Sequence, residues 1–169
     1  GGVLGLVYNA TKDPIAAAEN AKKTEAIKNV LPEFQELKDM NMKSAMEDVE
    51  LPFHLAYDAN GNFIGAAVET FTNKGFSGNI SLMVGILADG TVNNISVLQH
   101  AETPGLGSKM SEPSFKDQFN NKHADSFNFN VKKDGGDVDA ITAATISSRA
   151  FCDAVNRAIS TFENNKGGF

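Results

Sequence analysis

Residues 80–99 read ISLMVGILADGTVNNISVLQ, and this stretch decides the fold class. Two segments rich in apolar and β-branched residues, Ile80–Leu87 and Thr91–Gln99, flank the tripeptide Ala88-Asp89-Gly90. Such segments on both sides of a short Asp-Gly turn are typical of a β-hairpin. The stretch therefore predicts two neighbouring antiparallel strands.

A second hairpin is expected immediately before the first. Leu51–Tyr57 alternates toward the turn 58–62, Asp-Ala-Asn-Gly-Asn, and Phe63–Phe71 follows as a strand. The glycine-rich segment Asn73–Gly78 is expected to be the loop into the next strand. Read in order, these four strands predict an antiparallel sheet.

Helical patterns stand on both sides of the strands. Ala16–Met40 has apolar residues at helical spacing and predicts a mostly helical segment that is interrupted near Pro32. A second helix, from Thr145 or Ile146 to Phe162, is predicted by an apolar stripe. That stripe consists of Phe151, Val155, Ile159 and Phe162.

The segment between the strands and the last helix is expected to be less regular. His100–Lys109 is predicted as a loop, Glu112–Phe119 as a short helix and Phe127–Lys132 as a strand. The whole pattern predicts a single α+β domain, in which an antiparallel sheet is flanked by helices.

The two ends of the chain differ from the domain between them. Residues 1–9 are mostly apolar and end in Tyr8-Asn9, an order typical of a transmembrane helix where it leaves the bilayer. This piece is too short to span a membrane. It is therefore predicted to be the remnant of a truncated membrane anchor, which the N-terminal helix follows. The alternative is that residues 1–9 are a leftover tag followed by a short strand. The domain is expected over 10–165, with a frayed tail at 166–169.

Composition limits the classes of function. The 169 residues include 15 Lys and Arg against 21 Asp and Glu, a formal net charge of −6. This balance argues against binding of nucleic acid or of an anionic lipid surface, because both attract basic proteins. Cys152 is the only cysteine, which excludes an internal disulfide, and a buried, inert thiol is expected. His54 and His123 lack ligand-type spacing with other donors, so no metal site is expected.

Three segments are richer in glycine and polar residues than the fold alone requires, namely Asn73–Gly78, His100–Lys109 and Asp139–Arg149, and the third is the most informative. Residues 139–149 read DAITAATISSR. A helix N-terminus presents free N–H groups and a positive dipole end, which suits a phosphate, and Arg149 follows Thr145 by one turn. The alternative is that Thr142 or Thr145 simply caps an ordinary helix.

This segment resembles the flavinylation motif of the FMN-binding domain family, in which an acidic residue precedes Ser or Thr, then Gly, Ala and Thr. Ala143 departs from the motif, because the family usually has Gly there. Residues 100–107, His-Ala-Glu-Thr-Pro-Gly-Leu-Gly, resemble a loop in the G subunit of Rnf electron-transport complexes. The C subunit of the sodium-pumping NADH:quinone reductase carries a similar loop. Two such motifs in this order are more specific than either alone, and the likeness covers most of the chain.

The resemblance implies a covalent FMN cofactor, joined to Thr145 through a phosphoester by a separate flavin transferase. It implies that Asp139 fixes the turn or is recognised by that transferase. The backbone around Thr142 and Ala144 is expected to line the phosphate and ribityl end. The full set of residues expected at the cofactor is Asp139, Ile141, Thr142, Ala143, Ala144, Thr145, Glu102, Thr103, Gly105, Leu106 and Gly107.

The loop residues have separate expected roles against the isoalloxazine ring. The two glycines, Gly105 and Gly107, allow the backbone to approach the ring closely. Leu106 is expected to make an apolar contact. Glu102 and Thr103 are expected to offer polar groups to the edge of the ring.

The same resemblance implies an electron carrier with no substrate of its own. It would relay electrons between other subunits of a membrane-bound, ion-translocating Rnf-type complex that acts as a ferredoxin:NAD oxidoreductase. The domain is expected on the extracytoplasmic side, attached to the membrane by one N-terminal helix. The C subunit of the quinone reductase and another flavinylated extracytoplasmic domain are alternatives within electron transfer. A non-redox extracytoplasmic binding module is the alternative of a different class.

Overall fold

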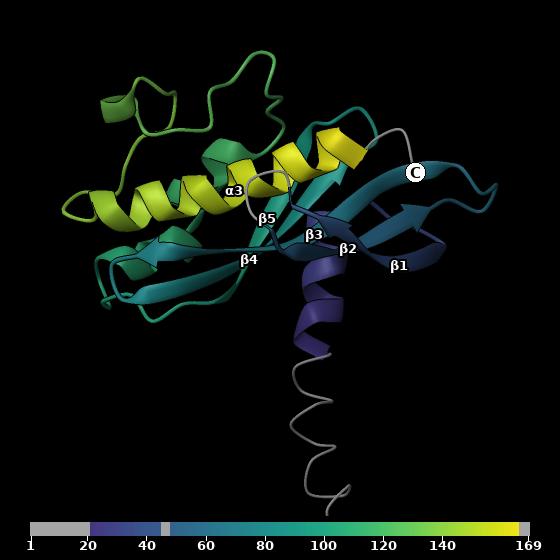
Figure 1. The fold of residues 1–169 in the computed structure, drawn as a ribbon, viewed down its shortest axis with the longest axis horizontal. Helices are drawn as coiled ribbons and strands as arrows, with labels where there is room; N and C mark the ends of the chain where they lie inside the picture. Colours follow the sequence, from purple (N-terminus) through teal and green to yellow (C-terminus); the bar gives the residue numbers. More distant parts are fainter. Residues whose placement is uncertain (1–20, 45–47, 166–169) are drawn as a thin grey trace, which may run out of the picture.

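The computed structural model describes residues 21–44 and 48–165 (Figure 1). The predicted anchor remnant at 1–9, the start of the predicted N-terminal helix and the predicted tail at 166–169 lie outside the described residues. Within the described ranges, no helix combines the length and the apolarity that crossing a membrane requires.

A five-stranded antiparallel meander forms the centre of the domain. Its strands pair in sequence order, so that neighbours in the chain are also neighbours in the sheet. The strands are β1 (Glu36–Lys43), β2 (Glu50–Tyr57), β3 (Phe63–Gly75), β4 (Gly78–Leu87) and β5 (Val92–Gln99). In the middle of the sheet Val84 lies opposite Val68 on one side and Ile95 on the other, and all three are buried. The predicted single α+β domain is confirmed.

Helix α3 (Thr145–Asn165) covers one face of this sheet (Figure 1). The predicted stripe from Phe151 to Phe162 is buried in the core, which confirms the helix and its core-facing side. Phe162 stacks on Phe63, so the end of α3 lies over the beginning of β3. The helix therefore runs along the sheet, and its first turn lies near the end of β3.

A helical segment at 21–30 packs against the opposite face (Figure 1). Its buried side chains Ala26, Ile27 and Val30 form a second apolar cluster with Ala67 and Met83 of the sheet. A Cβ atom added to Gly85 of β4 would lie 1.9 Å from the Val30 carbonyl oxygen, so only glycine permits this contact. The sheet is thus covered by a helix on each side.

The segment between β5 and α3 consists of short helical turns and loops. It includes η1 (Gly107–Ser111), α2 (Pro113–Lys116), η2 (Asp117–Phe119) and η3 (Lys132–Asp134). The short helix predicted over Glu112–Phe119 corresponds to α2 and η2. Phe115 and Phe119 pack edge-on and tilted against Phe151 of α3, which fixes this segment to the core.

Two predicted elements are wrong. The predicted helix does not continue to Met40, because β1 begins at Glu36 and pairs with β2 at the edge of the sheet. Phe127–Lys132 is not a strand; Phe129 and Val131 are buried as its alternation predicted, but the segment makes only one isolated bridge, from Val131 to Val138. The alternation in this segment indicates that every second side chain is buried. Within the described part of the chain, the segment lacks a neighbouring strand with which it could form a continuous set of backbone hydrogen bonds.

Candidate functional site

A cavity of about 350 Å³ opens at the end of the domain where α3 begins. Three segments that are distant in sequence form its walls: the tip of the β3–β4 hairpin, the loop after β5, and the start of α3. A cavity of this size is within the range of small-molecule binding sites. Its lining residues are Phe76, Thr103, Leu106, Gly107, Ala143, Ala144, Thr145, Ile146 and Ser147.

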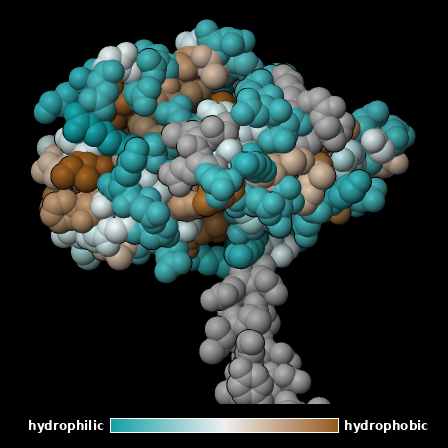
Figure 2. Space-filling view, viewed as in Figure 1, coloured by the Kyte–Doolittle hydropathy of each residue, from teal (hydrophilic) through white to brown (hydrophobic). Residues whose placement is uncertain are grey.

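The rim of this cavity is unusually apolar for a protein surface. Phe76 is 69% exposed, Ile146 is 50% exposed and Leu106 is 40% exposed, and each of the three lines the cavity. Figure 2 shows hydrophobic surface at the left end of the molecule, the end at which Figure 1 places the hairpin and the start of α3. An exposed apolar cluster around a cavity is typical of a binding site.

The start of α3 is fixed by one buried hydroxyl group. The Ser148 hydroxyl accepts a hydrogen bond from Ile141 N–H at 2.8 Å and donates one to the Ala144 carbonyl at 2.9 Å. The first backbone bond of the helix runs from Ser148 N–H to the same carbonyl. The N–H groups of residues 145–147 therefore face the end of the helix, as in any first helical turn. Thr145 is half-buried there, at the wall of the cavity.

Ala143 has a backbone conformation that normally favours glycine. Its φ angle is 62°, in the left-handed region, where a Cβ atom crowds the following carbonyl. Ala143 therefore differs from the motif in its side chain only. Its backbone has the conformation that the usual glycine would favour.

Glu102 is buried behind the cavity wall, with only 5% of its surface exposed. Its carboxylate accepts hydrogen bonds from Phe76 N–H at 2.8 Å, Ser77 N–H at 2.7 Å and the Ser147 hydroxyl at 2.7 Å. Burial alone would raise the pKa of Glu102, but the bonds from Ser147, Ser77 and Phe76 outweigh it and hold the pKa below its ordinary value. Glu102 is therefore an anion that ties all three walls together, and its two oxygens already have donors within the chain.

The two glycines of the loop differ in their surroundings. Gly105 has a φ angle of 80° and open space around its Cα, so the turn itself requires it. A Cβ atom on Gly107 would lie 2.5 Å from the Ser147 hydroxyl and 2.7 Å from the Glu102 Cβ, so this glycine allows the loop to pack on α3. Gly107 is buried and also lines the cavity.

The structure brings together six of the eleven residues predicted at the cofactor: Thr103, Leu106, Gly107, Ala143, Ala144 and Thr145. Asp139, Ile141 and Thr142 line a different hollow beside α2. Asp139 makes an ion pair with Lys132 at 2.7 Å, and its N–H donates to the Gln118 side chain, so it holds the loop before α3.

Three further residues near the motifs, Arg149, His100 and Cys152, have surroundings that the structure defines. Arg149 makes a bidentate ion pair with Asp134, in which Nε and Nη2 each donate to a carboxylate oxygen at 2.9 Å. Its guanidinium is therefore directed to that carboxylate. The His100 ring accepts a hydrogen bond from Glu102 N–H and caps the loop. Cys152 is buried, as predicted, and burial raises the pKa of its thiol to about 12.

Phe76, Ile146 and Ser147 line the cavity but were not predicted as site residues. The signal for Phe76 was present in the sequence, as an aromatic residue between Gly75 and Gly78. Such a residue is unusual in a tight turn, where small and polar residues dominate. For Ile146, the signal was an apolar residue outside the core stripe of the helix.

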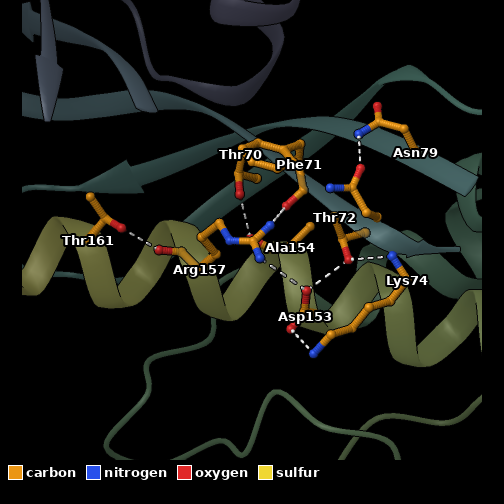
Figure 3. Close-up of polar contacts among 10 residues, drawn as sticks. Thr70, Phe71, Thr72, Lys74, Asn79, Asp153, Ala154, Arg157 and Thr161 are labelled. Atoms are coloured by element: carbon orange, nitrogen blue, oxygen red, sulfur yellow. Dashed lines mark hydrogen bonds and ion pairs between the residues drawn. The ribbon is translucent and has the colours of Figure 1, made fainter. Parts of the chain in front are cut away.

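Polar contacts brace the hairpin strand β3 against α3 (Figure 3). The Thr72 hydroxyl donates to Asp153 at 2.8 Å, and Lys74 makes an ion pair with the same carboxylate at 3.3 Å. The Thr70 hydroxyl donates to the Ala154 carbonyl, and Arg157 donates to the Phe71 carbonyl. The end of β3 is therefore held along the helix, directly before the residue that forms one wall of the cavity.

The model of the FMN-binding domain matches residues 75–160 of this chain, a range that contains the whole cavity. The G subunit of the ion-translocating oxidoreductase complex of Aliivibrio fischeri is 35% identical over 170 residues, covering 93% of this chain and 80% of that protein. The protein of the same name from Methanosarcina acetivorans is also 35% identical over 170 residues, covering 98% and 88%.

Two solved structures share the fold. NqrC of Shewanella oneidensis has a TM-score of 0.55 at 22% identity, covering 86% of this chain and 73% of that one. The C subunit of the Na(+)-translocating NADH-quinone reductase of Parabacteroides distasonis has a TM-score of 0.59 at 21% identity, covering 82% and 79%. At such identity the similarity shows a common fold.

Proposed function

This chain belongs to the FMN-binding domain family, and from that premise we propose that it is the FMN-carrying, electron-transferring G subunit of an Rnf-type ion-translocating oxidoreductase complex. The relatives described above at 35% identity are named as G subunits of that complex, whereas the quinone-reductase C subunits share only the fold. The observation that carries the proposal is Thr145, which begins α3 and lines an apolar-rimmed cavity within the family match.

The cavity fits FMN in two chemically different parts. The N–H groups at the start of α3, together with the helix dipole, suit the phosphate. The apolar side chains Phe76, Leu106 and Ile146 suit a flat aromatic ring. When bound, the flavin supplies the redox chemistry, and the residues of this chain orient it, exclude water from it and set its electrostatic environment.

The Thr145 hydroxyl is the proposed point of covalent attachment. A flavin transferase would join the Thr145 oxygen to the phosphorus of FAD that carries the riboflavin part. The phosphoanhydride bond breaks, AMP departs, and the hydroxyl proton passes to solvent. An unassisted threonine hydroxyl is a weak nucleophile, which explains the need for a separate catalyst. A covalent bond also retains the flavin when the concentration of free FMN is low.

Location follows from the proposed assembly. The relatives are named for an ion-translocating complex, and ion translocation takes place across a membrane. We place this domain on the extracytoplasmic side, attached by an N-terminal membrane helix. Covalent attachment is consistent with that side, where a dissociated cofactor would be lost. The other subunits of the complex are its electron donor and acceptor.

Intact mass tests the attachment. The protein is co-produced with a flavin transferase in an extracytoplasmic compartment, beside Thr145→Ala and the control Thr91→Ala, a threonine that lies between β4 and β5 and outside the motif. We expect a gain of one FMN less one water in the parent and in Thr91→Ala, and no gain in Thr145→Ala. An unmodified parent, with a transferase that is active on another substrate, would contradict the proposal, as would a gain that persists in Thr145→Ala.

A further inference from the structure

The tip of the β3–β4 hairpin presents an aromatic side chain to solvent. Gly75 and Gly78 pair across the hairpin and leave only Phe76 and Ser77 in the turn. Tight turns favour small and polar residues, because a large apolar side chain at such a position gains nothing from folding. With 69% of its surface exposed, Phe76 contributes little to the core of this domain.

The chain nevertheless holds this turn with a buried carboxylate. Both oxygens of Glu102 accept N–H groups of the turn, one from Phe76 and one from Ser77, and the Ser147 hydroxyl orients the same group. Burying a carboxylate is unfavourable unless hydrogen bonds replace its water. Three donors satisfy it here, and their common effect is to fix Phe76 beside the first turn of α3.

Resting on the function proposed above, we propose that Phe76 is the wall on which one face of the flavin ring packs, and that Glu102 is the positioning residue that holds this wall in place. Aromatic rings pack face to face with an offset, so a planar ring bound in the cavity can cover the exposed face of Phe76. Leu106 and Ile146 provide the remaining apolar surface. Glu102 acts through the hairpin, with its oxygens committed to the turn and to Ser147.

The strand that leads to Phe76 is also restrained. Thr72 and Lys74 both contact Asp153 of α3, four and two residues before Phe76 (Figure 3). A wall whose supporting side chains are already ordered loses little conformational entropy when a ligand packs on it. The hairpin is therefore arranged for the ring before the ring is bound.

Flavin fluorescence tests the contact. The chain has no tryptophan, and a tryptophan in contact with a flavin quenches its emission by electron transfer. We compare Phe76→Trp with Met40→Trp in the protein that carries covalent FMN. Met40 is also exposed and apolar, but it lies on the edge strand β1, away from the hairpin tip (Figure 1).

Phe76→Trp is expected to lose most of the flavin emission, while Met40→Trp keeps that of the parent. Equal emission from both variants would overturn the proposal and leave the proposed function intact, because the flavin would be attached but away from Phe76. A parent protein that takes up no flavin would overturn both.

Amide hydrogen exchange tests the positioning role in the flavin-free protein. Glu102→Gln keeps the shape of the side chain but replaces one acceptor oxygen with an NH2 group, so the Phe76 or the Ser77 amide loses its acceptor and is expected to exchange about tenfold faster. The matched control is Glu112→Gln, an exposed acid in the same region. Ser147→Ala, which leaves both amide bonds in place, gives a smaller acceleration at the same two amides. Unchanged exchange in Glu102→Gln would overturn the positioning role.

Discussion

The two halves of α3 use apolar side chains in opposite ways. From Phe151 onward, the large apolar residues of the helix are buried and pack against the sheet. In its first turn Ile146 remains half exposed, beside exposed Phe76 and Leu106. The same helix therefore supplies the core of the fold at one end and the exposed apolar wall of a cavity at the other.

This difference separates stability from function along one element. Apolar area that remains exposed contributes nothing to the hydrophobic stabilisation of the free domain, so it is available to a ligand. Polar contacts replace core packing at the functional end: Ser148 fixes the loop before the helix, and Glu102 joins the hairpin to its first turn. Substitutions in the two halves should therefore affect different measurements.

The largest expected effect is the loss of a core aromatic residue. Phe151→Ala removes a fully buried ring and should lower the free energy of unfolding by about 4 kcal/mol. Ile146→Ala, in the exposed first turn, should change it by less than about 0.5 kcal/mol. Urea denaturation followed by circular dichroism measures both, and similar losses in the two variants would remove the distinction between the halves.

The next effect concerns the buried cation in the core half. Arg157 stacks on the Phe71 ring with 4.7 Å from guanidinium carbon to ring centre, and it lies 3.6 Å from the Asp153 carboxylate. Arg157→Ala should lower the free energy of unfolding by about 3 kcal/mol, because it disrupts a buried charged network. Lys74→Ala removes the exposed partner of the same carboxylate and should cost less than about 0.5 kcal/mol. A larger loss from Lys74→Ala than from Arg157→Ala would show that burial does not determine the ranking.

A smaller effect, of opposite sign, is expected at the functional end. Ala143→Gly relieves the left-handed backbone conformation and should raise the free energy of unfolding by about 1 kcal/mol. Ala140→Gly, in the same loop, has no positive φ to relieve and should give no gain. Thermal denaturation of the two variants checks this, and a stability loss in Ala143→Gly would show that the alanine methyl group makes a favourable contact.

The smallest effect is a dependence on pH at the sheet surface away from the site. His54 lies between Glu69 at 3.0 Å and Asp39 at 2.7 Å. Burial lowers the pKa of His54, but the hydrogen bonds and charges of these two carboxylates outweigh it and raise the pKa above its ordinary value of 6.5. A raised folded-state pKa contributes stability that is complete below the unfolded value and is lost as pH rises through the folded value.

Stability should therefore fall slightly from about pH 6.5 upward, by less than about 1 kcal/mol because solvent screens the partly exposed group. His54→Gln should flatten this slope without changing the cavity at the start of α3, which His54 does not line. Chemical denaturation at several pH values measures it, and a slope that survives in His54→Gln would assign the dependence to other groups.

Local patterns predicted the elements whose signals lie within one segment. The stripe from Phe151 to Phe162 specified α3, and the Asp-Gly and Asn-Gly turns specified two hairpins. The same patterns were wrong for β1, where Glu, Lys and Met favour a helix. This strand is mostly exposed at the edge of the sheet, so no alternation of buried residues marks it, and pairing with β2 outweighs the weak helical preference.

The motifs predicted a set of cofactor residues that the structure divides between two hollows. Thr145 and the loop 103–107 were found because their spacing along the chain is characteristic. Asp139 and Thr142 belong to the same motif, yet the turn before α3 directs them into a different hollow. Neighbours in sequence can thus lie on opposite sides of one loop.

By itself, the sequence determined the order of four strands and the helix that covers them, with its start at Thr145 or Ile146, because periodicity and turn residues act over a few positions. Only the tertiary structure decided that Glu102 holds the hairpin tip and that Phe76 reaches the start of α3. Phe76 and Ser147 are 26 and 45 residues away from Glu102 in the sequence, so no local sequence pattern predicts these contacts. Their partners are chosen by packing of the whole domain, in which a buried carboxylate must find its donors wherever the fold provides them.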